Sequence, residues 1–207
     1  MESRVSATLE RLHREADADL PRIALGFARS IGRKLQPHHM GDAWMSIDRN
    51  QGRWLMELAE GLGARNVVEF GASFGISSIW LGAAMRNTGG RVTTTELQPN
   101  KVAAARRHIA EAGLDDVVTL LDGDARETLA PHDGPVDLLF FDGWSDLYDP
   151  LLTLMEPNLA SGAILVVDNA TMPGTVGFVR ALRTRRGWTA LEAPSSRVAL
   201  ARFAGGS

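Results

Sequence analysis

The residues with the clearest chemical meaning lie at 67–75, where a short apolar run ends in an acid and a glycine-spaced turn. Glu69 is followed by Gly71, Ser73 and Gly75. Glycine has no Cβ, so a loop of this kind turns sharply and lets a ligand approach the backbone closely. A helical pattern comes next, and the segment therefore predicts the strand, loop and helix that open a nucleotide-binding α/β fold.

The spacing of this loop bears on which ligand it binds. The order is E-x-G-x-x-x-G, whereas a dinucleotide's pyrophosphate is bound by the bare amides of a G-x-G-x-x-G loop at a helix N-terminus. An acid beside the loop suits a ligand with a cationic amine instead. S-adenosylmethionine (SAM) has that amine and no phosphate, so we expect the acid and the loop residues to contact it. An ordinary strand-to-helix turn is the alternative for this segment taken alone.

A second acid, Glu96, ends the next predicted strand at 92–96. Folds of this type place the carboxylate that binds a ribose diol roughly 20–30 residues after the loop. Taken alone, Glu96 would more often be a solvated charge at a strand end, but in this context the ribose role is favoured. A third strand is predicted at 117–121, and the acid of Asp124 or the backbone amide of Ala125 is then placed to meet an adenine edge.

Two further strand ends carry possible metal ligands. The predicted strand at 138–141 ends in Asp142, and the one at 164–167 ends in Asp168 and Asn169. Ligands of open α/β sheets bind beyond the carboxyl ends of strands, and adjacent strands lie roughly 4.8 Å apart. Two carboxylates and an amide oxygen suit Mg²⁺, whereas a structural zinc site would use Cys or His. Simple capping of loops is the alternative for Asp142 alone.

The elements that must position these residues alternate along the chain as strand and helix. Pro99 suits a helix start and Gly113 its end. The apolar strands are continuous rather than alternating, which favours a parallel sheet covered on both faces. The parallel strands are expected at 66–70, 92–96, 117–121, 136–141 and 163–167.

Both ends of the chain depart from this alternation. Apolar residues at helical spacing in the first 31 residues predict helices that precede the first strand. The runs at 188–191 and 198–203 are separated by too few residues for a helical crossover, so they predict an antiparallel hairpin that closes the sheet. We expect one domain over 1–207, with a helical lid segment at 1–45 and a Rossmann-like core at 46–207.

Composition limits the classes of protein and partner. The chain has 207 residues, 44% of them hydrophobic and 23% charged, which is enough for a substantial core. A net charge of -3 gives no basic surface for nucleic acid, and the absence of cysteine excludes disulfides and thiolate ligands. No apolar run approaches the roughly 18–20 residues that span a bilayer, and the first residues lack the apolar centre of a signal peptide. A cytoplasmic enzyme with no membrane or nucleic-acid partner is expected, and a homodimer is one option for its assembly.

Taken together, these pieces resemble the class I SAM-dependent methyltransferases, and within them the catechol O-methyltransferase-like group of small Mg²⁺-dependent enzymes. The resemblance extends from about Met40 to the end of the chain. The matching pieces are Met40-Gly41-Asp42, Glu69-Phe70-Gly71-Ala72, Glu96, Phe141-Asp142-Gly143-Trp144, Tyr148, and Asp168-Asn169 followed by Pro173-Gly174.

The resemblance implies a seven-stranded sheet whose last strand is antiparallel, and transfer of a methyl group from SAM to a hydroxyl of a small, catechol-like molecule. It implies that Glu96 binds the SAM ribose, that the loop at 69–73 faces the methionine portion and that Trp144 packs on adenine. Met40 and Asp142 are expected among the cofactor contacts as well. It further implies that the metal ligands are Asp142, Asp168 and Asn169.

The chain departs from the family pattern where a general base is expected. A lysine commonly follows the Asp-x-Trp segment in this family, whereas Ser145 stands here. A serine hydroxyl without an activating partner is a poor base. His38 or His39 can substitute, since an unperturbed imidazole with a pKa near ~6.5 accepts protons at neutral pH. The candidate catalytic residues are therefore Ser145, His38 and His39, although surface exposure is an equal alternative for the two histidines.

A second departure concerns the acceptor. Related enzymes can place an acid that contacts a catechol hydroxyl in the segment corresponding to 192–198, where this chain has Ser195, Ser196 and Arg197. The identity of the acceptor therefore stays open. A metal-independent O- or N-methyltransferase with a histidine base and a non-methyltransferase nucleotide-binding protein are the remaining alternatives.

Overall fold

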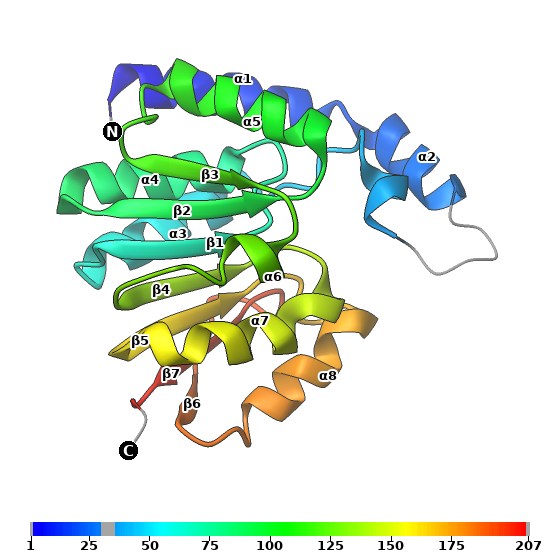
Figure 1. Ribbon diagram of the computed structural model, residues 1–207. Coiled ribbons are helices and arrows are strands. Elements are labelled where there is room, and N and C mark those ends of the chain that lie inside the picture. Colours follow the sequence, from blue (N-terminus) through cyan, green and yellow to red (C-terminus); the bar gives the residue numbers. More distant parts are fainter. Residues whose placement is uncertain (1, 30–35, 206–207) are drawn as a thin grey trace.

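A computed structural model describes residues 2–29 and 36–205 of the chain. Its centre is a seven-stranded sheet in the order β3-β2-β1-β4-β5-β7-β6, with helices on both faces (Figure 1). The strands are β1 (Asn66–Phe70), β2 (Arg91–Glu96), β3 (Val118–Asp122), β4 (Val136–Phe141), β5 (Leu159–Val167), β6 (Trp188–Leu191) and β7 (Ala199–Phe203). The first five strands pair in parallel, and β7 is antiparallel to both β5 and β6. The predicted Rossmann-like sheet with a reversed last strand is confirmed.

The helices begin and end largely where local signals place them. Pro99 occupies the first turn of its helix, and Gly113 follows its last residue in the left-handed conformation. None of the helices within the described ranges is long and apolar enough to cross a membrane. The helices are α1 (Ser3–Asp17), α2 (Leu20–Arg29), α3 (Arg49–Gly61), α4 (Ile76–Thr88), α5 (Pro99–Ala112), α6 (Ala125–Thr128), α7 (Tyr148–Met155) and α8 (Pro173–Leu182), with 3₁₀ turns η1 (Pro37–Met40), η2 (Ser145–Leu147) and η3 (Glu156–Asn158).

The sheet buries side chains on both of its faces, which explains the continuous apolar runs. Successive residues of a strand point to opposite faces. Val67 and Leu138 join the cluster formed with α1, α3, α4 and α5, while Val68 and Leu139 join the cluster formed with α6, α7 and α8. All four side chains are fully buried, and each such side chain contributes about 1.5–3 kcal/mol to the free energy of unfolding.

Some boundaries differ from those predicted. β5 begins at Leu159 rather than at 163, because Leu159 pairs with Val136 on β4. Ser161 and Gly162, which follow it, are exposed and give no apolar signal. The predicted helical run through Ile31 extends beyond the described residues.

The N-terminal segment is tied to the core at several points. Residues of α1 belong to the same buried cluster as α4 and α5. The Asp19 carboxylate, at the junction of α1 and α2, accepts a hydrogen bond of 2.7 Å from the Trp44 backbone. The Asn100 side chain on α5 donates to the Gly41 carbonyl at 2.9 Å. Figure 1 shows α2 and η1 on the side toward which the arrowheads of β2 and β3 point, which is where the predicted ligand residues lie.

Two glycines of α3 offer a matched test of this packing. A Cβ at Gly52 would overlap the Trp80 indole on α4, whereas a Cβ at Gly61 would meet nothing within 4 Å. We expect Gly52→Ala to lower the free energy of unfolding by about 1–3 kcal/mol through overpacking. Gly61→Ala is expected to be neutral or to stabilise by up to about 1 kcal/mol, since alanine is the better helix former. Urea denaturation measures both, and equal stability of the two variants would contradict the close approach of α3 and α4.

Candidate active site

The loops after β1 and β4 touch backbone to backbone. Gly71 has a φ of 103°, and a Cβ there would lie 2.7 Å from the Gly143 Cα. Only glycine combines this dihedral with such a close approach. The Asp142 amide also donates to the Phe70 carbonyl at 3.0 Å. The predicted cofactor loop at 69–75 therefore lies next to the end of β4. We call the ends of β4 and β5, which carry the predicted metal ligands Asp142, Asp168 and Asn169, the metal edge.

The Glu96 carboxylate is fixed at the end of β2 by two backbone amides. Its Oε2 accepts a hydrogen bond of 2.8 Å from the Ser73 amide, and its Oε1 accepts one of 2.8 Å from the Gln98 amide. Each oxygen keeps a lone pair for a further donor. The next residue, Leu97, is 51% exposed and presents an apolar surface beside the carboxylate. Glu96 and Leu97 together offer hydrogen-bond acceptors for a ribose and an apolar surface for a base, as a nucleoside requires.

Three buried polar atoms at this end of the sheet have no hydrogen-bond partner within the described part of the chain. They are the Glu69 Oε1, the Ser73 Oγ and the Thr95 Oγ1. Ser73 also has a φ of 49°, which a non-glycine residue seldom adopts. Buried polar atoms usually have partners, and unpaired ones clustered at one place fit a polar ligand. The residues present therefore fit the polar part of a nucleoside-type cofactor.

Glu69 is fully buried and is surrounded by hydroxyl groups. It accepts hydrogen bonds from the Ser78 hydroxyl on α4 and, at 2.5 Å, from the Thr94 hydroxyl on β2. Burial raises the pKa of Glu69, and the nearby hydroxyl groups oppose this rise only in part. Ser78 and Thr94 both donate to Oε2, whereas Oε1 has no hydrogen-bond partner within the described part of the chain.

The three predicted metal ligands lie together at the ends of β4 and β5. The Asn169 amide nitrogen donates to Asp142 Oδ1 at 3.3 Å and to Asp168 Oδ2 at 3.1 Å. Burial raises the pKa of Asp142 well above its usual range, and the neighbouring Asp168 raises it further. The amide group supplies the positive end of a dipole between two carboxylates, and turning it over would present its oxygen there instead.

This edge fits a divalent cation by the chemistry of its donors. Among the described residues, Asp142 and Asp168 form no ion pair, although the charges of Arg197 and Lys101 act on Asp142 from farther away. Hard oxygen ligands of this kind suit Mg²⁺. Within residues 2–29 and 36–205, no group of three or more His, Asp and Glu side chains is arranged to hold a metal. The candidate site therefore depends on two carboxylates and one amide.

Gln51 is a member of this edge that the sequence did not predict. Its side-chain amide on α3 donates to Asp168 Oδ1 at 2.6 Å, and its backbone amide is capped by Asp48 at 2.9 Å. Arg197 lies 3.6 Å from Asp48, and its carbonyl accepts a hydrogen bond of 2.8 Å from Ala170, next to Asn169. The capping pattern at 48–51 is a sequence signal for the helix start, but nothing in it indicates the contact with Asp168.

The candidate bases occupy different places. The Ser145 hydroxyl packs against α8, since a Cβ at Gly174 would lie 2.5 Å from it. The His39 side chain is buried, and its Nδ1 accepts a hydrogen bond of 3.0 Å from the Gln36 amide. The lone pair of Nδ1 is therefore already used. The His38 side chain lies outside the described part of the structure.

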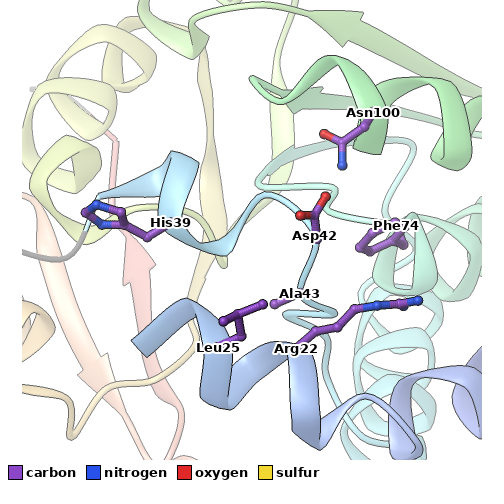
Figure 2. Close-up of a pocket in the computed structure, with 7 residues that line it drawn as sticks. All are labelled: Arg22, Leu25, His39, Asp42, Ala43, Phe74 and Asn100. Carbon is purple, nitrogen blue, oxygen red and sulfur yellow. The ribbon is translucent and has the colours of Figure 1, made fainter. Parts of the chain in front are cut away.

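His39 belongs to a cavity of about 460 Å³ (Figure 2). Figure 2 shows its lining, which comes from α2, η1 and the following segment, the loop after β1 and the start of α5. None of the three predicted metal ligands lines this cavity. The lining residues are Arg22, Leu25, His39, Asp42, Ala43, Phe74 and Asn100.

The remaining predicted cofactor residues surround the same end of the sheet. The Met40 side chain is buried and packs against α2. Trp144 is half-buried at the start of η2. The Asp124 carboxylate caps α6 and is held by the Arg126 side chain at 2.6 Å, while Ala125 is buried. The engagement of Asp124 leaves the backbone at Ala125 as the freer group for an adenine edge.

The chain is similar to known methyltransferases in sequence and in fold. Residues 68–170 match a family described as a methyltransferase domain. The chain is 35% identical over 64% of its length to a catechol O-methyltransferase of Mycobacterium tuberculosis, and 32% identical over 64% of its length to one of Niastella koreensis. It spans only 60% and 61% of the length of these two relatives. A cofactor-bound crystal structure of Rv0187 from MTB is 26% identical, with a TM-score of 0.73 over 91% of this chain and 92% of that one.

The fold and the matched segment define a Rossmann-like methyltransferase domain. Within that class, the chain is similar to the catechol O-methyltransferase-like SAM-dependent methyltransferases.

The position of Glu96 predicts a measurable effect on cofactor binding. Removal of a charge-assisted hydrogen bond costs about 1.5–3 kcal/mol, so Glu96→Ala is expected to weaken S-adenosylhomocysteine (SAH) binding by roughly 10- to 150-fold. Isothermal titration calorimetry measures the affinity, and Glu127→Ala, which removes an exposed acid from α6, is the control. Unchanged affinity in a folded Glu96 variant would remove this residue from the site.

The metal edge predicts a direct effect on cation binding. Asp168→Asn keeps the volume of the side chain and removes its charge, so we expect Mg²⁺ affinity to fall at least about tenfold. Asp133→Asn, in an exposed loop before β4, is expected to leave it unchanged. Calorimetric titration with Mg²⁺ distinguishes the two, and equal affinities would contradict a metal site at Asp168.

Proposed function

We propose that this protein is a SAM-dependent O-methyltransferase that methylates a hydroxyl of a small, catechol-like molecule with the assistance of a divalent metal. The observation that carries the proposal is the contact between Gly71 and Gly143, since it puts a cofactor loop beside an edge of hard oxygen ligands. Similarity to catechol O-methyltransferases supports the reaction class, and the chain spans about 60% of the length of these relatives.

Cofactor binding would use the end of β2 and the loop after β1. Glu96 would accept hydrogen bonds from a ribose diol, and Leu97 and Trp144 would flank the adenine ring. Glu69 and Ser73, whose unpaired oxygens lie at this end of the sheet, would bind the amino acid portion. When bound, SAM supplies a methyl group on a cationic sulfur, which becomes the neutral thioether of SAH as the carbon–sulfur electron pair stays on sulfur.

Acceptor binding would use the neighbouring edge. Asp142, Asp168 and Asn169 would hold the divalent cation, and Gln51 would keep the Asp168 carboxylate in its orientation. When bound there, a divalent cation lowers the pKa of a coordinated hydroxyl and fixes its position. The fold's contribution is alignment, because in-line displacement requires the acceptor oxygen close to the methyl carbon and opposite the sulfur.

The proton of the acceptor hydroxyl needs a destination, and the chain offers two arrangements. His39 would accept it if its ring gave up the hydrogen bond from Gln36. Otherwise an acidified hydroxyl would lose its proton to water without a dedicated base. The buried position of His39, and a cavity lining that contains none of the metal ligands, favour the second arrangement. Ser145 would then act in positioning only.

The function is tested by a methyl-transfer screen over catechols, monohydric phenols and amines, with Mg²⁺ or with EDTA. The proposal expects turnover of a catechol that requires the metal. Turnover that resists EDTA would select a metal-independent enzyme instead. Binding of NAD in preference to SAH would exclude a methyltransferase.

The two arrangements for the proton predict different pH profiles. With a histidine base, kcat/KM should rise with an apparent pKa of roughly 6–7, near that of free imidazole. His39→Ala should then remove this limb and slow the reaction about 10²- to 10⁴-fold. Without a base, His39→Ala and the distant control His132→Ala should both stay within a few-fold of the wild type. We expect the second result, and a lost limb in His39→Ala would overturn it.

A further inference from the structure

A buried lysine lies beside the proposed cofactor site and has no role in the chemistry described above. Lys101, on the first turn of α5, is only 5% exposed. Its ammonium group lies 5.5 Å from the centre of the Phe74 ring. Lysine is almost never buried to this extent without a partner, yet among the described residues no hydrogen bond or ion pair reaches this group.

The position of Lys101 is fixed by its neighbours. Phe74 stacks on Trp44 with the ring centres 4.3 Å apart, and its carbonyl bonds to His108 at 2.9 Å. The residue before Phe74 donates its amide to Glu96, so the lysine and the proposed ribose carboxylate contact the same loop. Lys101 therefore lies at the cofactor end of the sheet, over a ring that is itself packed against Trp44.

The charges around Lys101 come from both sides of the site. Burial lowers the pKa of this lysine, while carboxylates oppose that effect, Glu96 foremost and then Asp142, Asp19 and Asp42. These carboxylates act on Lys101 from a distance, and Asp19 is itself paired with Arg22 at 3.1 Å. The Lys101 ammonium group therefore exerts its charge on the region between Glu96 and the metal edge. Solvent screens charges only weakly in a buried place.

We propose that Lys101 is a specificity residue that distinguishes the two charge states of the cofactor, weakening the binding of SAM relative to SAH. The inference rests on the proposed function, since it requires the ribose at Glu96. The sulfur of SAM is joined to the ribose through a single carbon, so a ribose bound at Glu96 brings the cationic sulfur near Lys101. SAM carries one positive charge more than SAH, and a buried cation repels that charge alone.

The repulsion has a catalytic consequence. The positive charge on sulfur disappears as the methyl group leaves, so a nearby cation raises the energy of the bound reactants more than that of the transition state. An interaction that is unfavourable only before the reaction lowers the barrier and weakens SAM binding at the same time.

The test compares SAM and SAH binding in four proteins by calorimetry. Lys101→Met keeps the length of the side chain and removes its charge. We expect it to raise the affinity for SAM relative to SAH by at least about tenfold, the scale for like charges roughly 12 Å apart at an effective dielectric constant of ~20. Lys101→Arg should keep the wild-type ratio. Arg107→Met removes an exposed charge from the same helix, and its ratio should also be that of the wild type.

The outcomes separate this inference from the proposed function. If the wild type binds neither SAM nor SAH, the proposed function is wrong. If both bind and Lys101→Met changes their affinities by the same factor, Lys101 is only a structural residue and the inference is overturned. If Lys101→Met does not fold, Lys101→Gln and the charge-preserving Lys101→Arg take its place. An equal ratio of SAM to SAH affinity in these two folded variants would also overturn the inference.

Discussion

The close approach of two loop backbones is the constraint on which the rest of the site depends. A Cβ at Gly71 would overlap the backbone of Gly143, and a Cβ at Gly143 would overlap the Phe70 ring, so neither position has room for a side chain. The loop that holds the Glu96 carboxylate and the edge that carries Asp142 are thereby set at one separation. This separation is set by the backbone rather than by mobile side chains. It matters because methyl transfer depends on the alignment of donor and acceptor.

Local sequence patterns predicted the parts of the molecule that local physics determines. The strand ends at Glu96, Asp142 and Asp168, and the helix limits at Pro99 and Gly113, follow from periodicity and capping, and the structure has them within a residue. The convergence of Asp142 with Asp168 also followed, because parallel strands end at one edge of the sheet. The reversed β7 agrees with the hairpin inferred from its short connection.

The contacts that escaped prediction join residues far apart in the chain. Gln51 has no feature in its own helix that indicates a bond to Asp168, 117 positions later. The burial of Lys101 and its contact with Phe74 likewise have no signal in the sequence of α5. These two features depend on tertiary packing, which a short window of sequence does not encode. His39 is a local exception: it looked available as a base, but a hydrogen bond from Gln36, in its own turn, uses one ring nitrogen.

The place of β7 in the sheet affects how the chain assembles. β7 lies between β5 and β6, although both precede it in the sequence. While the protein is being synthesised, β5 therefore presents an open edge of unpaired peptide groups until 199–203 emerge from the ribosome. Such an edge can pair wrongly with another nascent chain. The strand that carries Asp168 at its end thus gains its second neighbour last, so the candidate metal site is framed on both sides only after residues 199–203 have been made.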